Sequence, residues 1–137
     1  MYLRLVGAVA VLVSAVVHLQ MWFDGVRHQH ALGPAFLLNA VGGAVIAVLL
    51  VTWAHWVPPL LTAGFGVSTL GAFTVAASVG LFGVHEHWAG VQVWTAAAAE
   101  AVAIVVGAVL LSRVEALQGR SPGQAQHRLT LGRLHLH

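Results

Sequence analysis

The sequence predicts an all-α fold: a membrane four-helix bundle, antiparallel and up-down-up-down, with both termini in the cytoplasm. Three observations predict it, namely the composition, four long apolar runs and the distribution of arginine. Hydrophobic residues fill 59% of the 137 positions and charged residues only 7%, and the mean hydropathy is +0.88. A soluble domain of this size could not cover its surface with so few charges, so we expect the chain to lie in a membrane.

Apolar runs place four spans, each long enough to cross a bilayer, at residues 3–23, 33–53, 58–82 and 91–112. The first run has a single arginine, Arg4, at its start and lacks a small-x-small cleavage site, so we expect it to be retained rather than removed as a signal peptide. The spans form one transmembrane domain, 1–112, and we expect no separate soluble catalytic domain. Residues 113–137 are polar, and we expect a cytoplasmic tail that is disordered or contacts a partner.

Turn residues connect the spans. Pro58 and Pro59 suit the first turn of the third span. The first N–H groups of a helix have no partner within it, and proline has no N–H group that would need one. The short link at 54–57 therefore predicts a tight antiparallel hairpin of spans two and three. Longer loops at 24–32 and 83–90 join the other pairs.

Arginine predicts the orientation, because cytoplasmic flanks carry the excess of positive charge. Arg27 lies alone on one side of the bundle. The other side carries Arg4, Arg113, Arg120, Arg128 and Arg133. We therefore expect a multi-pass protein of the plasma membrane with both termini cytoplasmic. Trp22 falls at the outer interface, where amphipathic aromatic side chains are typical.

Missing residue types exclude several chemistries. The sequence has no cysteine, which excludes disulfides, thiolate metal sites and iron–sulfur clusters. All its basic residues apart from histidine are arginine, so no lysine is present to form an internal Schiff base. A net charge of +2 is too small for a nucleic-acid surface. No serine triad, phosphate loop or pair of catalytic carboxylates occurs either, so the sequence provides no positive sign of catalysis.

Polar side chains inside the spans are the main candidates for function, because they are costly in lipid and usually face the bundle interior. The intramembrane set is His18, Asn39, Glu100, Thr74, Ser78 and Trp22. At about 1.5 Å per residue, the first three lie roughly 8, 9 and 14 Å below the outer surface, within reach of a common layer. We expect Glu100 to be protonated or paired with His18 or Asn39. Two interpretations stay open: a hydrogen-bond network that fixes helix register, or a ligand or proton site.

Small residues predict the packing faces, because they let helices approach closely in lipid. In the third span such a face carries Gly64, Ser68, Gly71 and Ser78. In the fourth span it carries Ala96, Ala99, Ala103 and Gly107, and Glu100 shares it. In the first span one stripe holds Gly7, Val11, Ser14, His18 and Trp22. These faces predict a close bundle with Glu100 in its interior.

Two His-x-His pairs lie in the outer loops, each with a carboxylate nearby. The candidate metal ligands are His28, His30, His85, His87, Asp24 and Glu86. Four imidazoles and a carboxylate suit Zn(II) or Cu(II), and in an extended loop both histidines of a pair can reach one ion. The alternative is that these are solvated loop residues. Haem is less favoured as a cofactor, because His18 is the only histidine deep in a helix.

Three segments resemble small four-span integral membrane proteins of high-GC actinobacteria: HLQMWFDG at 18–25, GPAFLLNAVGG at 33–43 and GLFGVHE at 80–86. The resemblance implies a four-helix integral membrane protein and assigns no active residue. Asn39 ahead of Gly42, and Gly64-Phe65 ahead of STLGAFT at 68–74, are similar to the small four-span fluoride channels. That second similarity implies a permeation path, although the arginine of that family's first span is missing.

Four functions are compatible with these observations. An accessory or interaction subunit, packed in a larger membrane complex or in a homo-oligomer and surrounded by lipid, is the first. A metal-handling protein that uses the outer histidines and carboxylates is the second. The third is a proton-linked or small-solute permeation protein that uses His18, Asn39 and Glu100. The fourth is an enzyme acting on a lipid or quinone, which would need a hydrophobic pocket near Trp22 and Trp94.

Overall fold

The computed structural model describes residues 1–78 and 90–118, which form four long helices and one short 3-10 turn. The helices are α1 (Tyr2–Phe23), α2 (Leu32–Thr52), α3 (Val57–Ser78) and α4 (Val91–Gln118), with the turn η1 (Val26–His28) between the first two. All four are long and apolar enough to cross a membrane. The prediction is confirmed to this extent: the described residues are helical and include four helices that are long and apolar enough to span a membrane.

The ends of the helices follow local signals. The chain turns after α1 at Gly25, whose φ of 136° is a conformation that glycine adopts readily. Pro58 and Pro59 occupy the first turn of α3, as predicted. Helix α4 continues past the predicted end of its span at 112, because the polar residues there are good helix formers that need no lipid around them. Residues 79–82 of the predicted third span lie outside the described residues.

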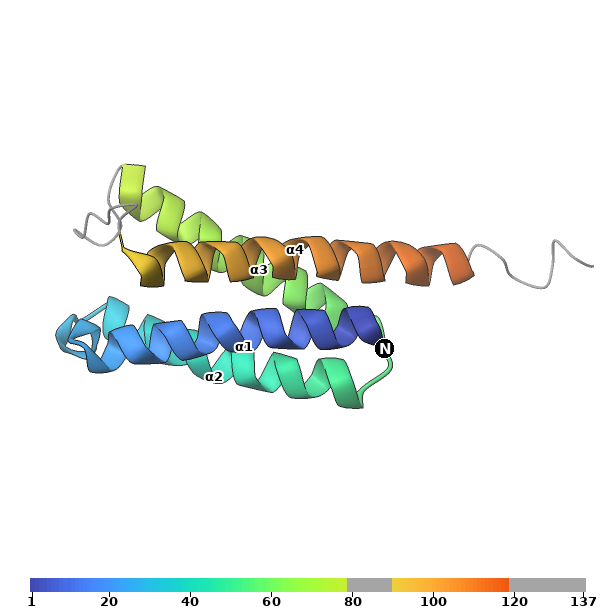
Figure 1. Cartoon of the computed structure of the whole chain (residues 1–137), viewed down its shortest axis with the longest axis horizontal. Helices are drawn as coiled ribbons and strands as arrows, with labels where there is room; N and C mark the ends of the chain where they lie inside the picture. The colour runs from blue at the N-terminus through green and yellow to red at the C-terminus, as the bar shows by residue number, and fades with distance from the viewer. Residues whose placement is uncertain (79–89, 119–137) are drawn as a thin grey trace, which may run out of the picture.

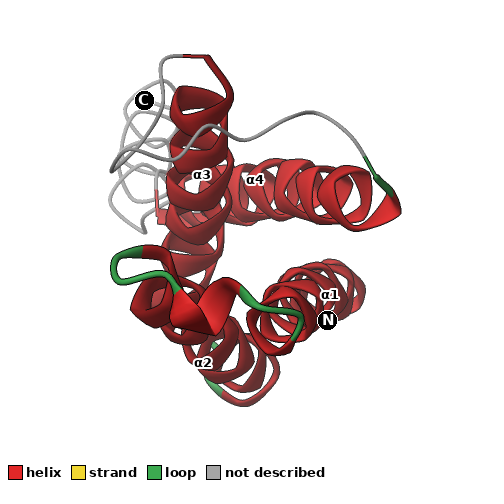
Figure 2. Cartoon of the chain, turned by 90° about the vertical axis from the view of Figure 1, so that its left-hand side faces the viewer, coloured by secondary structure: helices red, strands yellow, loops and turns green. Residues whose placement is uncertain are grey.

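The four helices do not pack equally. Helix α1 contacts both α2 and α4, and α3 packs mainly on α4. Helix α3 runs at an angle to the other three, so that α2 and α3 diverge and make few contacts (Figures 1 and 2). The prediction of a tight hairpin of spans two and three is therefore wrong for the helices, although their link is short. The first part of α3 packs on α4, and this packing directs α3 away from α2.

The core lies where α1, α2 and α4 meet. Its most buried members are Val11, Leu50 and Ala103, each at most 1% exposed. At one end of the core, Arg4 donates hydrogen bonds to the carbonyl oxygens of Leu50, Trp53 and His55 at 3.0, 3.0 and 2.8 Å. The carbonyl of Leu50 lies in the last turn of α2, where helical partners are missing, and Trp53 and His55 follow the helix. The bonds from Arg4 place the first turn of α1 against the last turn of α2.

Helices α3 and α4 approach closely through glycine. A Cβ added to Gly107 would lie 2.7 Å from the backbone nitrogen of Ala63, and one added to Gly66 would lie 2.6 Å from the carbonyl oxygen of Glu100. The predicted small-residue face of α4 is buried, and its Gly107 lies against α3. The predicted face of α3 is not, since Gly64 and Gly71 have no atom within 4 Å of such a Cβ. Helix α3 instead packs on α4 through the opposite face, which carries Gly66.

Candidate functional site

A cavity of about 750 Å³ lies among the four helices. Most of its wall comes from α2 and α3, where these helices diverge, and α1 and α4 close the other side. We call it the interhelical cavity. Its wall is almost entirely apolar, and the polar side chains in it are His18, Asn39, Ser68, Thr69 and Glu100. An apolar pocket with a few convergent polar groups is the usual form of a small-molecule site.

Glu100 lies on the α4 side of the cavity and is only 2% exposed. The hydroxyl of Ser14 on α1 donates a hydrogen bond to its Oε1 at 3.0 Å. Among the described residues, nothing donates to the second oxygen, Oε2. A buried carboxyl therefore lines the cavity with one of its two oxygens free to accept a hydrogen bond.

His18 lies one helical turn after Ser14 and faces the same carboxyl. Its Nδ1 is 2.8 Å from the carbonyl oxygen of Ser14. A carbonyl only accepts, so Nδ1 carries the hydrogen, and Nε2 holds a lone pair when the ring is neutral. Nε2 lies 4.0 Å from Oε1 of Glu100, too far for a hydrogen bond but close enough for an ion pair with a protonated ring.

The ring of His18 also packs against α2. Its centroid is 4.9 Å from that of Phe36, with the two planes inclined at 55°. Together with the hydrogen bond from Nδ1, this contact fixes how Nε2 points, which is how a proton-carrying imidazole is usually held. His18 is therefore positioned by two helices and presents one defined nitrogen to Glu100.

Asn39 lines the same cavity one turn after Phe36 on α2. Its amide nitrogen donates to the hydroxyl oxygen of Thr69 on α3 at 2.8 Å. Its amide oxygen, Oδ1, is buried and accepts no hydrogen bond from the described residues. A buried unpaired acceptor costs about 1–3 kcal/mol.

The rest of the predicted intramembrane set lies elsewhere. The hydroxyls of Thr74 and Ser78 are exposed and donate to carbonyl oxygens of their own helix, Leu70 and Thr74 respectively. Neither side chain lines the cavity. Trp22 is half-buried and meets Phe23 edge to face, with 5.1 Å between ring centroids. The structure thus brings together His18 and Glu100, joins Asn39 to the same cavity, and places the other three outside it.

The described part of the loops that were predicted to lie outside contains three of the candidate metal ligands. Asp24 accepts a hydrogen bond from Gln92 at 3.3 Å, and His28 accepts one from Arg27 at 3.2 Å. Within residues 1–78 and 90–118, no three histidine or carboxylate side chains converge as metal ligands would. His30 is exposed. His85, Glu86 and His87 lie outside the described residues, so the metal site stays a prediction.

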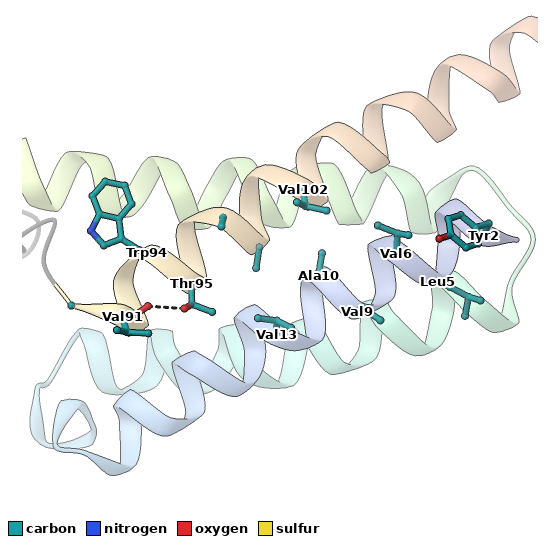
Figure 3. Close-up of a pocket in the computed structure, with 13 residues that line it drawn as sticks. Tyr2, Leu5, Val6, Val9, Ala10, Val13, Val91, Trp94, Thr95 and Val102 are labelled. Carbon is teal, nitrogen blue, oxygen red and sulfur yellow. Dashed lines mark hydrogen bonds between the residues drawn. The ribbon is translucent and has the colours of Figure 1, made fainter.

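A second, wider groove of about 1080 Å³ runs between α1 and α4 on another face (Figure 3). It extends from Tyr2 to Val91, and valine, leucine and alanine side chains form most of its wall. Thr95 lines it, but its hydroxyl donates to the carbonyl oxygen of Val91 within α4. Trp94 lines the groove and Trp22 does not, so the pocket that a lipid or quinone enzyme would need near both tryptophans is present only in part.

Comparison of the chain with known protein families, with characterised proteins and with solved structures finds no match. The two family resemblances described above therefore stay predictions.

Two residues of the site were not predicted from the sequence as polar partners. Ser14 appears in the sequence only as a small residue on a packing stripe, yet it is the donor to Glu100. Its position four residues before His18 was the available signal, because i and i+4 share a helix face. Thr69, the partner of Asn39, gave no such signal. Its pairing depends on how α2 and α3 cross.

Proposed function

We propose that this chain is a membrane-embedded binding protein for a lipid-soluble molecule that has an apolar body and a polar group. The observation that carries the proposal is a buried carboxyl, Glu100, that lines an apolar cavity with one oxygen free. The volume of about 750 Å³ falls within the range of roughly 300–1,000 Å³ typical of small-molecule sites. The apolar wall would hold the body of the ligand and the polar residues its polar group.

A purely structural network accounts less well for the same residues. Polar groups that only fix helix register are expected to satisfy one another, because an unpaired polar group in a membrane interior is costly. Here the amide oxygen of Asn39 has no partner among the described residues, and the carboxyl of Glu100 has one donor for two oxygens. An ionised carboxylate at the centre of a bilayer costs about 2.5–3.5 kcal/mol on insertion scales. The carboxyl of Glu100, which lines the cavity, would gain from a bound ligand.

Filling the cavity tests the proposal. Gly64 lines the cavity, and a Cβ built there meets no atom within 4 Å, so Gly64→Leu should project into the cavity without disturbing the helices. Gly71 on the same helix is equally open but does not line the cavity, so Gly71→Leu is the matched control. We expect the first variant to lose binding by at least about tenfold and the second to keep it, because only the first occupies the ligand's volume.

The measurement uses probes with one hydrocarbon chain and different polar groups. Protein in lipid nanodiscs is titrated with n-octylammonium, n-octanol and n-octanoate, and empty nanodiscs correct for partitioning into lipid. Saturable binding of at least one probe to the wild type and to Gly71→Leu, but not to Gly64→Leu, supports the proposal. If no probe saturates, or if both leucine variants bind like the wild type, the cavity is not a binding site.

We further propose that the four helices cross the plasma membrane up-down-up-down with both termini cytoplasmic. The arginine distribution supports this orientation. The hydrogen bonds from Arg4 to the end of α2, and the bond between Asp24 and Gln92 at the start of α4, are compatible with it.

Reporter fusions test the orientation. A reporter fused after His137 should be active in the cytoplasm, and one inserted near His30 should be active only outside, because positive flanks stay inside. A matched fusion in which Arg4 and Arg113 are replaced by glutamine should weaken the preference. An external C-terminus in the unmodified chain would reject the orientation.

The other functions predicted from the sequence stay predictions. An accessory subunit would use outer surfaces of the bundle, such as the apolar groove between α1 and α4. The permeation hypothesis uses the same three residues as the binding proposal. Permeation differs from binding alone in one further step, because the solute must also be released on the far side of the membrane.

A further inference from the structure

The unpaired polar atoms at the interhelical cavity are mainly hydrogen-bond acceptors. Oε2 of Glu100 and Oδ1 of Asn39 accept no hydrogen bond from the described residues. Nε2 of His18 holds the third free lone pair, because Nδ1 carries the hydrogen that Ser14 accepts. The free donors in the cavity are fewer than the acceptors. Ser68 donates within its own helix, Thr69 accepts from Asn39 and keeps one hydrogen, and the amide of Asn39 keeps one N–H. Acceptors are therefore in excess, and a ligand that matches them must supply donors.

The charge of the cavity points in the same direction. Among the described residues that line it, Glu100 and His18 are the only titratable ones, and α2 and α3 contribute none. No arginine of the described residues lines it. Arg4 is engaged with the end of α2, and Arg27 with His28 in the outer loop. A carboxylate here can be neutralised by a proton, by the imidazolium of His18 or by a bound cation.

We propose that the interhelical cavity binds a lipophilic primary amine as its ammonium ion. This inference rests on the proposed function and names its ligand class. An ammonium group supplies N–H donors for Oε2 of Glu100 and Nε2 of His18, and its positive charge complements Glu100. The hydrocarbon part lies against the apolar wall, where Phe65 and Phe73 contribute. An alcohol would supply one donor and no charge, and a carboxylate would be repelled.

Binding exchanges a cation for a proton. When Glu100 is protonated, the incoming ammonium pairs with the carboxylate and the carboxyl proton leaves to water. When His18 is the protonated partner, its Nε2 proton leaves instead, and the ammonium replaces the imidazolium beside Oε1. One proton is released for each ammonium bound in either case. Protons compete with the ligand, so the affinity for ammonium should rise with pH while the amine itself stays protonated.

Four probes with the same hydrocarbon chain separate charge from hydrogen bonding. In the wild type in nanodiscs, we expect n-octylammonium to bind at least about tenfold more tightly than n-octanol, and n-octanoate to bind no better than n-octanol. n-Octyltrimethylammonium has the charge but no N–H, and we expect it to bind more weakly than n-octylammonium. Raising the pH from about 6 to about 8 should tighten binding of n-octylammonium and leave n-octanol unchanged.

Variants then show which residue is responsible for the preference for n-octylammonium over n-octanol. Glu100→Gln keeps an oxygen for the Ser14 hydroxyl but has no charge, so this variant should bind n-octylammonium no more tightly than n-octanol. Thr74→Val, on an exposed face of α3 outside the cavity, is the control and should bind like the wild type. The comparison among probes uses the wild type alone, so it stands even if a variant fails to fold.

The outcomes distinguish this inference from the proposed function. If n-octanol binds as tightly as n-octylammonium and Gly64→Leu abolishes both, the cavity binds amphiphiles without preference for ammonium, and only this inference is overturned. If n-octyltrimethylammonium equals n-octylammonium, charge alone is recognised and the primary-amine class is wrong. If no probe saturates, both the inference and the proposed function are rejected.

Discussion

Replacing Gly107 with alanine should destabilise the packing of α3 on α4 by about 1–3 kcal/mol. The added Cβ would lie 2.7 Å from the backbone nitrogen of Ala63 and 2.8 Å from the carbonyl oxygen of Pro59. Carbon normally approaches non-bonded atoms to about 3.5–4.0 Å. Two of the obstructing atoms belong to backbone, so a side chain cannot simply turn aside, and the helices must separate. The gain of about 1 kcal/mol in helix propensity from glycine to alanine does not offset that separation.

Gly71→Ala is the matched control, because it makes the same chemical change on α3 at a position with no atom within 4 Å. It should leave stability unchanged or raise it slightly. Reversible unfolding of the purified protein in mixed micelles measures both variants, and a cross-link between cysteines placed on α3 and α4 reports their separation. Equal stability of the two variants would show that α3 and α4 do not approach as closely as described.

The number and positions of the spans could be predicted because the physics behind them is local. An apolar run long enough for the bilayer must pair its backbone internally, so it forms a helix. The predicted starts at 3, 33, 58 and 91 agree with α1 to α4 within one residue. The end of α4 was less predictable, because hydropathy reports where the apolar residues stop and not where the helix stops.

The packing face of α3 could not be predicted in this way. Gly64 and Gly71 lie on one side of the helix, and Thr62 and Gly66 lie on the other, so small residues mark two faces. In water the apolar side would identify the buried one, but a helix that is apolar all round carries no such signal in lipid. The face with Gly66 packs on α4, and the face with Gly64 borders the cavity. The cavity forms because α3 packs on α4 through the face with Gly66. The sequence does not identify that face, so it did not predict the cavity.

The site was predictable to the extent that it lies on a continuous stripe. Ser14 and His18 share a face of α1, and Glu100 shares a face of α4 with alanines, so burial of these side chains follows from periodicity. Which of them bond depends on the rotation of α1 against α4, and that is a tertiary property. Asn39 bonds to Thr69 and not to Glu100 because of how α2 and α3 cross, which is also a tertiary property.

The hydrogen bond between Ser14 and Glu100 should stabilise the fold measurably. Both residues are buried, at 0% and 2% exposure, and the bond is 3.0 Å long. Hydrogen bonds between membrane helices contribute about 0.6 kcal/mol on average and up to about 1.7. We expect a value near the upper limit, because the acceptor is a carboxyl and Ser14 is the only described residue that donates to it.

A double-mutant cycle isolates this contribution. Ser14→Ala alone should cost about 1–2 kcal/mol, because it leaves the Glu100 carboxyl buried without its donor. In a Glu100→Leu background the same change should cost less than about 0.5 kcal/mol, since the acceptor is gone. Glu100→Gln with Ser14 intact should remain within about 0.5 kcal/mol of the wild type, because the amide oxygen still accepts the hydroxyl.

The comparison of glutamine with leucine at 100 separates support for the fold from ligand chemistry. If Glu100 only holds α1 to α4, glutamine serves as well as glutamate in every measurement. If it also binds an ammonium ion, glutamine preserves stability and loses the ligand, because stability depends on Oε1 and binding depends on the charge and on Oε2. A coupling energy near zero between Ser14 and Glu100 would mean that α1 and α4 are not rotated as described, and the geometry on which the cavity argument depends would have to be abandoned.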